Sequence, residues 1–468
     1  MAVIDDILKE FQPGSTKTWT ELFLKESKQE NLQAHKSFMG FDYLPFYTAQ
    51  KDFSQQTALI TSLIAKKGNG WNTINEFSVN NPAEQNKAIL ASFEKGCSGI
   101  TLIGDIHDIE HLSTLLKGVL ANHIEINFKS TKNPLALAQL YKQWCEENNQ
   151  DPNRVFGSIE CDPIGKAFTQ GKWNTTKEKD LEDFVNTYIY VNANFKQVKC
   201  ITVDAGIYHY SGANLNQTLA YTILHALEYL NLLDAKKIKP AEAANRTTIE
   251  WPVGINFFGE IAALRAFHVL WNNLIQHINK DQKNTFAPKI SSHTSFFYWS
   301  GNDKQNNLLR STTQVMAAAA GGAGSIYVYP YNTLNTTVDD SAKRLATNVQ
   351  LLLREESFMD KIIDPAGGSY FVEDLTEQFC TNALAIVKEI EHNGGLVAEF
   401  EKGKIQDAVN DNAQSLIEAY KTSTIKILGS NLFPNAKESG KLTVKDYFGN
   451  KSAGKEFEPL QKFILDAN

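Results

Sequence analysis

The sequence predicts an α/β fold, a (β/α)8 TIM-type barrel with an N-terminal arm and a C-terminal helical appendage. The first observation is that short apolar segments rich in Ile, Val, Phe and Thr alternate with longer helical patterns. Strict alternation is typical of a parallel sheet with right-handed crossovers. The second is that eight strand–helix units fit within residues 72–359, a length typical of a closed barrel. An open, doubly wound sheet is compatible with the same alternation, because closure alone separates the two folds.

Each expected strand is short and bounded by Gly, Pro, Asn or Asp, as buried strands are. The expected strands are 72–79, 99–103, 124–128, 155–160, 200–205, 249–257, 288–293 and 325–329. Helical patterns fill the segments between and after them. The expected helices are 82–95, 107–122, 133–148, 178–196, 213–234, 258–279, 304–320 and 339–359.

The clearest helix is 213–234, where apolar residues recur at spacings of four, four, four and three. These residues form one stripe on a helix, and Asn214 is a suitable cap before it. The stripe consists of Leu215, Leu219, Ile223, Leu227 and Leu230.

The alternation divides the chain into three parts. Residues 1–68 do not fit it and are expected to form the N-terminal arm, and residues 69–359 form the barrel. Residues 360–468 are expected to form a helical appendage, with a second apolar stripe over 405–420 and a loose tail from 436 onwards. The first stripe of the appendage consists of Leu375, Phe379, Ala383, Ile386 and Ile390.

Composition excludes several classes of protein. The chain has 468 residues and a net charge of -7, whereas a nucleic-acid-binding protein usually needs a basic face. Its five cysteines are scattered, as expected of free thiols in a reducing compartment. The N-terminus lacks the basic start and apolar core of a signal peptide, and no apolar run approaches the roughly 18 residues of a membrane span. We expect a cytoplasmic protein without nucleic-acid or membrane partners.

The active site of a barrel lies at the C-terminal ends of its strands. After the second expected strand, His107 and His111 are four residues apart and could share a metal on one helix face. The alternative is that Asp105 or Asp108 caps the helix and the histidines are solvated. We favour the second interpretation and expect no metal site.

Two further histidines follow expected strands. His209 lies in the aromatic segment Tyr208-His209-Tyr210 after the fifth strand, and His293 lies among hydroxyl residues at the seventh. Either could donate or accept a proton, or could be hydrogen-bonded locally in a structural role.

Several segments together resemble the methylmalonyl-CoA mutase family of adenosylcobalamin-dependent acyl-CoA mutases. The matches run in the family's order and include DPAGGSY, preceded by NVQLLLREES, which is a specific combination. The matching segments are LPFYTAQKDF at 44–53, SGANLNQTLAYTILHALEYLN at 211–231, INFFGEIAALRAFHVLW at 255–271, NNLLRSTTQVMAAAAGGAGSI at 306–326, and ATNVQLLLREES followed by DPAGGSYFVEDL within 346–375. The family's substrate-binding domain is a (β/α)8 barrel, as the alternation predicts independently.

The chain departs from the family's catalytic pattern at the strand ends. Catalytic chains carry an arginine and a tyrosine near the first strand, where Ile74 and Glu76 stand here. At the fifth strand the family's tyrosine and histidine fall on Gly206 and Ile207, although a slip of two residues would place them on Tyr208 and His209. The seventh-strand pattern keeps its histidine as His293 but loses its arginine and glutamine. Glu76, Tyr208, His209 and His293 are therefore candidates for a vestigial pocket, and we expect no catalytic residues.

The cobalamin-binding pattern D-x-H-x-x-G is also missing from the sequence. Its nearest match is Asp105-Ile106-His107, with Glu110 in place of the glycine. The resemblance therefore implies the small, non-catalytic subunit of a heterodimeric mutase, without a cobalamin-binding domain. The partner would be the homologous catalytic large subunit, which binds adenosylcobalamin and the acyl-CoA and converts methylmalonyl-CoA to succinyl-CoA.

Two other functions remain open on the sequence. The chain could be the catalytic barrel of an acyl-CoA mutase whose cobalamin domain is a separate chain, although Glu76 and Ile74 do not fit this. More remotely, it could be an unrelated metal-dependent barrel enzyme or a binding scaffold.

The first 68 residues carry many aromatic side chains, which on a loose arm would favour aggregation. We expect the arm to pack largely against the partner chain. The alternative is that it wraps around its own barrel.

Overall fold

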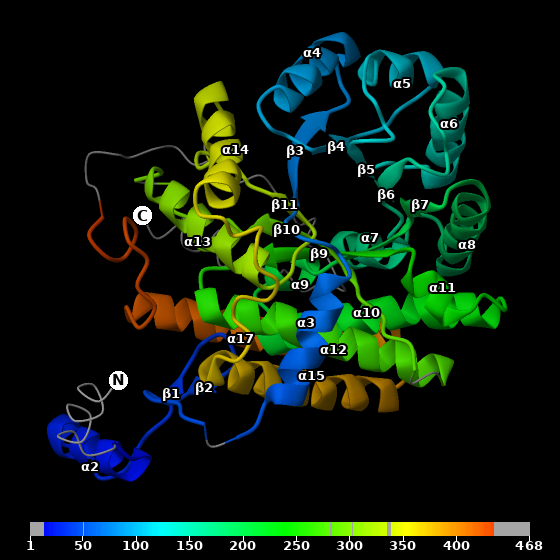
Figure 1. Ribbon diagram of the computed structural model, residues 1–468. Coiled ribbons are helices and arrows are strands. Elements are labelled where there is room, and N and C mark those ends of the chain that lie inside the picture. Colours follow the sequence, from blue (N-terminus) through cyan, green and yellow to red (C-terminus); the bar gives the residue numbers. More distant parts are fainter. Residues whose placement is uncertain (1–13, 50, 281–282, 302, 335–337, 435–468) are drawn as a thin grey trace, which may run out of the picture.

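The computed structural model describes residues 14–49, 51–280, 283–301, 303–334 and 338–434. Its centre is a parallel sheet with the strand order β7-β6-β5-β4-β3-β11-β10-β9-β8 (Figure 1). The strands are β3 (Asn72–Ser78), β4 (Gly99–Ile103), β5 (Glu125–Lys129), β6 (Phe156–Ile159), β7 (Gln197–Lys199), β8 (Ile201–Asp204), β9 (Thr247–Val253), β10 (Lys289–Thr294) and β11 (Ser325–Tyr327).

The sheet is nearly closed into a barrel. Its two edge strands, β7 and β8, are consecutive in the chain and separated only by Cys200, so together they form the fifth strand of the barrel. The backbone amides of Cys200 and Ile201 both donate to the Arg246 carbonyl oxygen at 3.1 Å, which interrupts the regular ladder at this point. All eight expected strands are present, and the barrel, rather than the open sheet, is confirmed.

Helices surround the barrel in the expected order. The eight principal ones are α4 (Pro82–Phe93), α5 (Ile109–Leu115), α6 (Pro134–Glu147), α8 (Lys177–Asn194), α10 (Leu215–Ala235), α12 (Phe257–Asn279), α13 (Asn306–Ala320) and α14 (Asp340–Glu355). The prediction of a helix over 107–122 is wrong in its length, because the chain leaves the helix before Gly118, which has a φ of 78°. Three short helices were not predicted: α7 (Pro163–Gln170), α9 (Gly206–His209) and α11 (Pro240–Ala244).

Helix α10 begins at the predicted cap. The Asn214 side chain accepts from the Gln217 amide at 3.0 Å, and the Gln217 side chain accepts from the Asn214 amide at 3.0 Å, which completes a capping box. All five residues of the predicted stripe are buried. Burial extends to other faces of the helix as well, because α10 contacts β8 on one side and α12 and α15 on others.

The C-terminal appendage forms an outer layer on these helices. It consists of α15 (Tyr370–His392), α16 (Leu396–Glu401) and α17 (Lys404–Lys421). Helix α15 lies along α12 and α10, and Leu375, Phe379 and Ala383 of its predicted stripe are fully buried (Figure 1). The tail expected from residue 436 onwards lies outside the described residues.

A buried ion triad joins this layer to the barrel helices and explains the DPAGGSY segment. Arg265 of α12 donates to Asp364 of that segment and to Glu373 of α15, the latter at 2.5 Å, and all three side chains are fully buried. Glu373 also accepts from Thr57 at 2.6 Å and from the Gly368 amide at 3.0 Å. The triad therefore fixes α12, α15 and the turn between α14 and α15 to one another.

The N-terminal arm has two parts with different surroundings. It contains α2 (Thr16–Ser27), the hairpin of β1 (His35–Lys36) and β2 (Asp42–Tyr43), and α3 (Ser54–Ala65). Met39 and Phe41 are buried, and the Phe41 ring lies 5.4 Å from Phe379 of α15. Helix α3 contacts α12 and buries Ile60, whereas α2 buries no residue. Residues 39–41 and α3 thus pack on the body of the chain, whereas α2, within the described residues, buries no residue and stacks Trp19 on Phe46 of the arm.

Candidate functional site at the barrel mouth

The residues that line the barrel axis are those whose side chains point to the inner face of each strand. Phe128 of β5 and Trp251 of β9 face outward, where their rings lie 5.0 Å from a tyrosine ring of α6 and 5.9 Å from a phenylalanine ring of α12. Successive residues of a strand point to opposite faces. The neighbours Lys129 and Glu250 therefore face the interior of the barrel, and their side chains form an ion pair at 2.5 Å.

Acidic side chains surround Lys129 at the C-terminal ends of the strands. Burial alone would lower the pKa of Lys129, but the negative charges of Glu250, Glu76 and Asp204 outweigh it and hold that pKa above its usual value. Burial, and then the charge of Glu250, raises the pKa of Asp204 to about 7. Burial also raises the pKa of Glu160. This end of the barrel thus holds four carboxyl groups near Lys129, and one of them, Glu160, also interacts with Lys166.

A second polar layer crosses the barrel nearer the N-terminal ends of the strands. Glu125 of β5 pairs with Lys289 of β10 at 2.6 Å and accepts from Asn72 and Ser325, both also at 2.6 Å. Asn127 donates to the same carboxylate at 3.4 Å. The interior is therefore filled at two levels by charged, hydrogen-bonded side chains that reach across it.

The structure brings three of the four candidates for the vestigial pocket to this end of the barrel. Glu76 and His293 both interact electrostatically with Lys129, and His209 interacts with His293. Burial, then the charge of Lys129, lowers the pKa of His293 to about 3. The Tyr208 hydroxyl, in contrast, is hydrogen-bonded to the Nδ1 atom of His225 in α10 at 3.1 Å, so Tyr208 lies within the helical layer.

The residues on the family's catalytic positions lie in packed surroundings. The Ile74 side chain fills the barrel next to Gly99, where an added Cβ would lie 2.4 Å from its Cδ1 atom. Gly206 donates its amide to Asp204 at 2.7 Å, and Ile207 packs against Gly165 in the first turn of α7.

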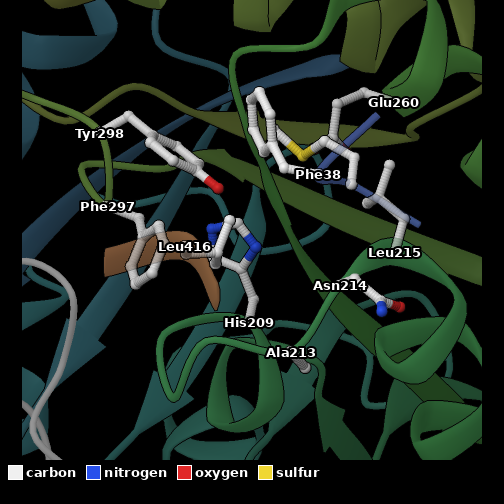
Figure 2. A pocket seen from close by; sticks show the side chains of 10 residues that line it. Phe38, His209, Ala213, Asn214, Leu215, Glu260, Phe297, Tyr298 and Leu416 are labelled. Carbon is white, nitrogen blue, oxygen red and sulfur yellow. The ribbon is translucent and has the colours of Figure 1, made fainter. Parts of the chain in front are cut away.

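A small pocket lies beside His209 at the barrel mouth (Figure 2). The His209 Nε2 atom is 2.7 Å from the Ser295 hydroxyl, and burial lowers the pKa of His209 to about 3. On another wall Glu260 accepts from the Gly254 amide at 2.8 Å, and burial raises its pKa to about 7. The cavity volume is about 10 Å³, which is room for about one water molecule.

The arm and the appendage both contribute walls to this pocket. Phe38 and Met39 come from the arm, Leu416 from α17, and Tyr298 from the loop after β10. Figure 2 shows the Tyr298 hydroxyl pointing toward the His209 ring. The barrel mouth is therefore covered here by segments from both ends of the described chain.

The histidine pair after the second barrel strand has a structural setting. Asp108 caps α5 by accepting from the His111 amide at 2.8 Å, as the capping interpretation predicted. The His111 Nε2 atom lies 2.8 Å from the Val79 carbonyl oxygen, and the His107 and His111 rings are 5.7 Å apart. Among the residues that the structure describes, no group of three His, Cys, Asp or Glu side chains could hold a metal ion.

Sequence reasoning missed Lys129, Glu250 and the buried pair of Asp162 and His225. The Asp162 carboxylate lies 2.9 Å from His225 and accepts from Tyr229 at 2.6 Å. The available signal was a charged residue within or at the end of an apolar strand, as in EINFK and TTIEWPV. Such a residue must either reach solvent or find a partner inside the barrel.

Fold and site together define a (β/α)8-barrel chain whose axis is occupied by partly buried ion pairs. The sequence matches the methylmalonyl-CoA mutase family over residues 90–464, so the chain belongs to this family of isomerases and the motif resemblance is confirmed. In the part of the chain that the structure describes, no helix has the length and apolar character needed to cross a membrane.

Relatives of this chain include both small and large mutase subunits. It is 29% identical to the methylmalonyl-CoA mutase small subunit of Porphyromonas gingivalis, over 97% of this chain and 76% of the relative. It is 27% identical to the small subunit of Streptomyces virginiae, over 73% of this chain and 54% of the relative. It is 26% identical to the large subunit of Propionibacterium freudenreichii, over 66% of this chain and 42% of the relative. The chain thus spans about three quarters of the first relative and about half or less of the other two.

Proposed function

We propose that this chain is the small, non-catalytic subunit of a heterodimeric methylmalonyl-CoA mutase. In this proposal a homologous large subunit binds the acyl-CoA and adenosylcobalamin and converts methylmalonyl-CoA to succinyl-CoA, and this chain stabilises it. The relatives named as small subunits support the role in assembly.

The observation that carries the non-catalytic role is the pair of charged layers inside the barrel. The ion pair of Lys129 with Glu250 occupies the axis at the C-terminal strand ends, where a substrate would bind, and the pair of Lys289 with Glu125 fills the axis nearer the N-terminal ends. Breaking a fully buried ion pair costs about 3–5 kcal/mol, because a charge is left without its partner. The carboxylates here are nearly buried, but the Lys129 and Lys289 side chains are 25% and 23% exposed, so the cost is smaller. An acyl chain that entered here would have to meet this cost, and the adjoining pocket has room for about one water molecule.

The side chain at the position of the family's tyrosine supports the same conclusion. Glu76 is a carboxyl group that interacts electrostatically with Lys129, whereas the family's catalytic chains use a phenol there. Its charge therefore contributes to the charged layer, and it offers no phenolic hydroxyl to a substrate.

The described residues at the nearest match to the cobalamin-binding pattern do not fit cobalamin. Asp105, which stands at the first position of the nearest D-x-H match, accepts from the Lys132 amide at 2.7 Å and pairs with the Lys132 ammonium group at 3.1 Å. It is therefore committed to the loop after β5 and not to His107. We assign the cofactor to the large subunit.

The cysteines support a cytoplasmic location for the complex. All five are free thiols, and four of them are buried. Such thiols persist where the compartment is reducing.

The proposal is tested by assaying the chain alone, the large subunit of the same organism alone, and the co-expressed complex, each with adenosylcobalamin and methylmalonyl-CoA. We expect no turnover by this chain alone. Robust turnover by the isolated chain would contradict the proposal. Activity restored by a separate cobalamin-domain chain, without a second barrel, would instead favour the catalytic alternative.

A variant of the complex tests the role of Glu76 directly. Glu76→Gln in this chain should leave kcat of the complex within about twofold, because the reaction takes place in the other barrel. The matched control carries a substitution of the family's tyrosine in the large subunit and should lose activity. A large fall in kcat for Glu76→Gln, with an intact complex, would place catalysis in this chain.

A further inference from the structure

The turn between α3 and β3 carries one of the two Asn-Gly pairs in the chain. Asn69-Gly70 lies in this turn, and Asn393-Gly394 follows α15. In such a pair the glycine nitrogen can attack the asparagine side chain most easily, because glycine has no Cβ to obstruct the approach. The surroundings of the two pairs therefore decide which of them reacts.

The structure protects the pair after α15. The Gly394 amide donates to the Glu391 carbonyl oxygen at 3.2 Å, which holds its nitrogen in the last turn of the helix. Asn393 has a ψ of -2°, so the Gly394 nitrogen lies next to the Asn393 amide nitrogen and not next to the Asn393 side chain. Ring closure here would first require the helix end to open.

The pair in the turn before β3 has no such protection. Asn69 is exposed to solvent. Within the residues that the structure describes, neither the Asn69 side chain nor the Gly70 amide makes a hydrogen bond. The nucleophilic nitrogen and the side chain that it would attack are therefore both available.

A cation lies beside this peptide bond. The Lys67 ammonium group donates to the Gly70 carbonyl oxygen at 2.6 Å and to the Gly68 carbonyl oxygen at 3.4 Å, so it contacts the peptide groups on both sides of the Asn69–Gly70 bond. As the ring closes, negative charge develops on the Gly70 nitrogen and then on the Asn69 side-chain oxygen. A positive charge that is already in place stabilises both.

A carboxylate lies beside the same glycine. A Cβ atom built on Gly70 would lie 3.3 Å from the Cβ atom of Asp360. The Asp360 Oδ1 atom is buried and has no hydrogen-bond partner in the described part of the chain. It can therefore accept the Gly70 proton through one water molecule.

We propose that Asn69-Gly70 is a site of self-modification of this chain. The Gly70 nitrogen attacks the side-chain carbonyl carbon of Asn69 and passes its proton through water to Asp360. The new carbon–nitrogen bond closes a cyclic succinimide, the bond to the side-chain nitrogen breaks, and that nitrogen takes up a proton from water and leaves as ammonia. Water then opens the ring at either of its carbonyl groups, which leaves aspartate or isoaspartate at position 69.

The modification changes the connection between α3 and the barrel. Both products place a carboxylate beside Lys67, and isoaspartate also lengthens the backbone by one carbon atom. The start of β3 is fixed, because the Trp71 indole donates to Gln350 at 3.1 Å and the Asn72 amide donates to the Gly324 carbonyl oxygen at 2.9 Å. The added carbon must be accommodated within the turn itself. The inference does not depend on the proposed function, since the reaction needs only this chain and water.

The test follows the purified full chain during incubation at 37 °C and pH 8. After digestion with chymotrypsin, the segment 64–71 contains Asn69 as its only asparagine, so mass spectrometry reports its conversion directly. Isoaspartyl methyltransferase then identifies the isoaspartate product. We expect Asn69 to be converted at least tenfold faster than Asn393 in the same sample, and equal rates or an unchanged Asn69 would overturn the proposal.

Two variants test the roles of the neighbouring charges. Lys67→Met and Asp360→Asn should each slow the conversion of Asn69 at least threefold, whereas the matched control Lys66→Met should stay within about twofold of wild type. Circular dichroism shows whether each variant is folded. A folded variant that reacts as fast as wild type would refute the role assigned to the side chain that it replaces.

Unfolding the chain in urea provides a measurement that needs no substitution. The two Asn-Gly pairs should then react at rates within about threefold of each other, because the helix end, Lys67 and Asp360 no longer act on them. A tenfold difference that persisted in urea would show that local sequence, and not the fold, sets the reactivity of Asn69.

Discussion

Replacing Arg265 by methionine should destabilise the fold strongly. The substitution keeps a long side chain but leaves the carboxylates of Asp364 and Glu373 buried without their cation. Removing one partner of a buried ion pair costs about 3–5 kcal/mol. This is a large part of the roughly 5–15 kcal/mol that stabilises a folded domain, so the midpoint of urea unfolding, followed by tryptophan fluorescence, should fall clearly.

The pH dependence separates the loss of charge from the loss of packing. Burial raises the pKa of Glu373, but hydrogen bonds from Thr57 and Gly368 and the charge of Arg265 outweigh it, and the pKa lies below its usual value. A carboxyl group with a lowered pKa contributes stability above its unfolded pKa and loses it as the pH falls through the folded pKa. Without the guanidinium this pKa rises, so the deficit of Arg265→Met relative to wild type should be smaller at pH 5.5 than at pH 8.

A compensated variant completes the test. Arg265→Met/Asp364→Asn/Glu373→Gln removes all three charges and keeps groups that can accept from Thr57 and Thr61, so it should recover most of the lost stability. A deficit below about 1 kcal/mol for the single variant, or one of equal size at both pH values, would refute the reasoning.

Three further predictions concern the barrel and its helices, and urea unfolding measures each. Since burial and Glu250 raise the pKa of Asp204 to about 7, its contribution to stability is present below pH 4 and lost as the pH rises to 7. Asp204→Asn should therefore gain stability relative to wild type at pH 8 and not at pH 4, and an equal effect at both would contradict this. In Gly157→Ala the new Cβ would lie 1.8 Å from a β5 carbonyl oxygen, so the free energy of unfolding should fall by at least about 3 kcal/mol. The control Gly403→Ala has open space around it and should lose only about 1 kcal/mol. Asn214→Ala should cost about 0.5–2 kcal/mol by removing the cap of α10, and no change in the unfolding midpoint would show that the capping box is dispensable.

The strands and principal helices could be predicted because their signals are local. Short segments of five to seven residues between turn residues define β5 and β3 wherever the rest of the chain lies. The cap at Asn214 is likewise a matter of a few neighbouring residues. Local signals failed at β7 and β8, where hydrogen bonds to Arg246 interrupt one strand, and this interruption depends on the neighbouring β9.

Many side-chain partners lie far apart along the chain, so a local sequence pattern cannot show which residues will meet. Arg265 pairs with residues 99 and 108 positions further on, so a helical pattern could show that it lies on α12 but not that it is fully buried in an ion triad. The adjacent Tyr208 and His209 show the same limit. Tyr208 contacts His225 of α10, and His209 contacts Ser295 of the loop after β10. Both lie on α9, where successive side chains point in different directions.

The sequence by itself determined the barrel, its order of elements, the family and the departure from the family's catalytic residues at Glu76 and Ile74, since each follows from residue identity and spacing. Only the tertiary structure decided what fills the barrel and which part of the described arm packs on the barrel helices. Closure of the sheet converts Lys129, a residue at the end of an apolar strand, into a partly buried cation that interacts with Glu76, Asp204 and Glu250. The physical reason is that burial and charge pairing are properties of three-dimensional neighbours, which the chain acquires only when the two edges of the sheet meet.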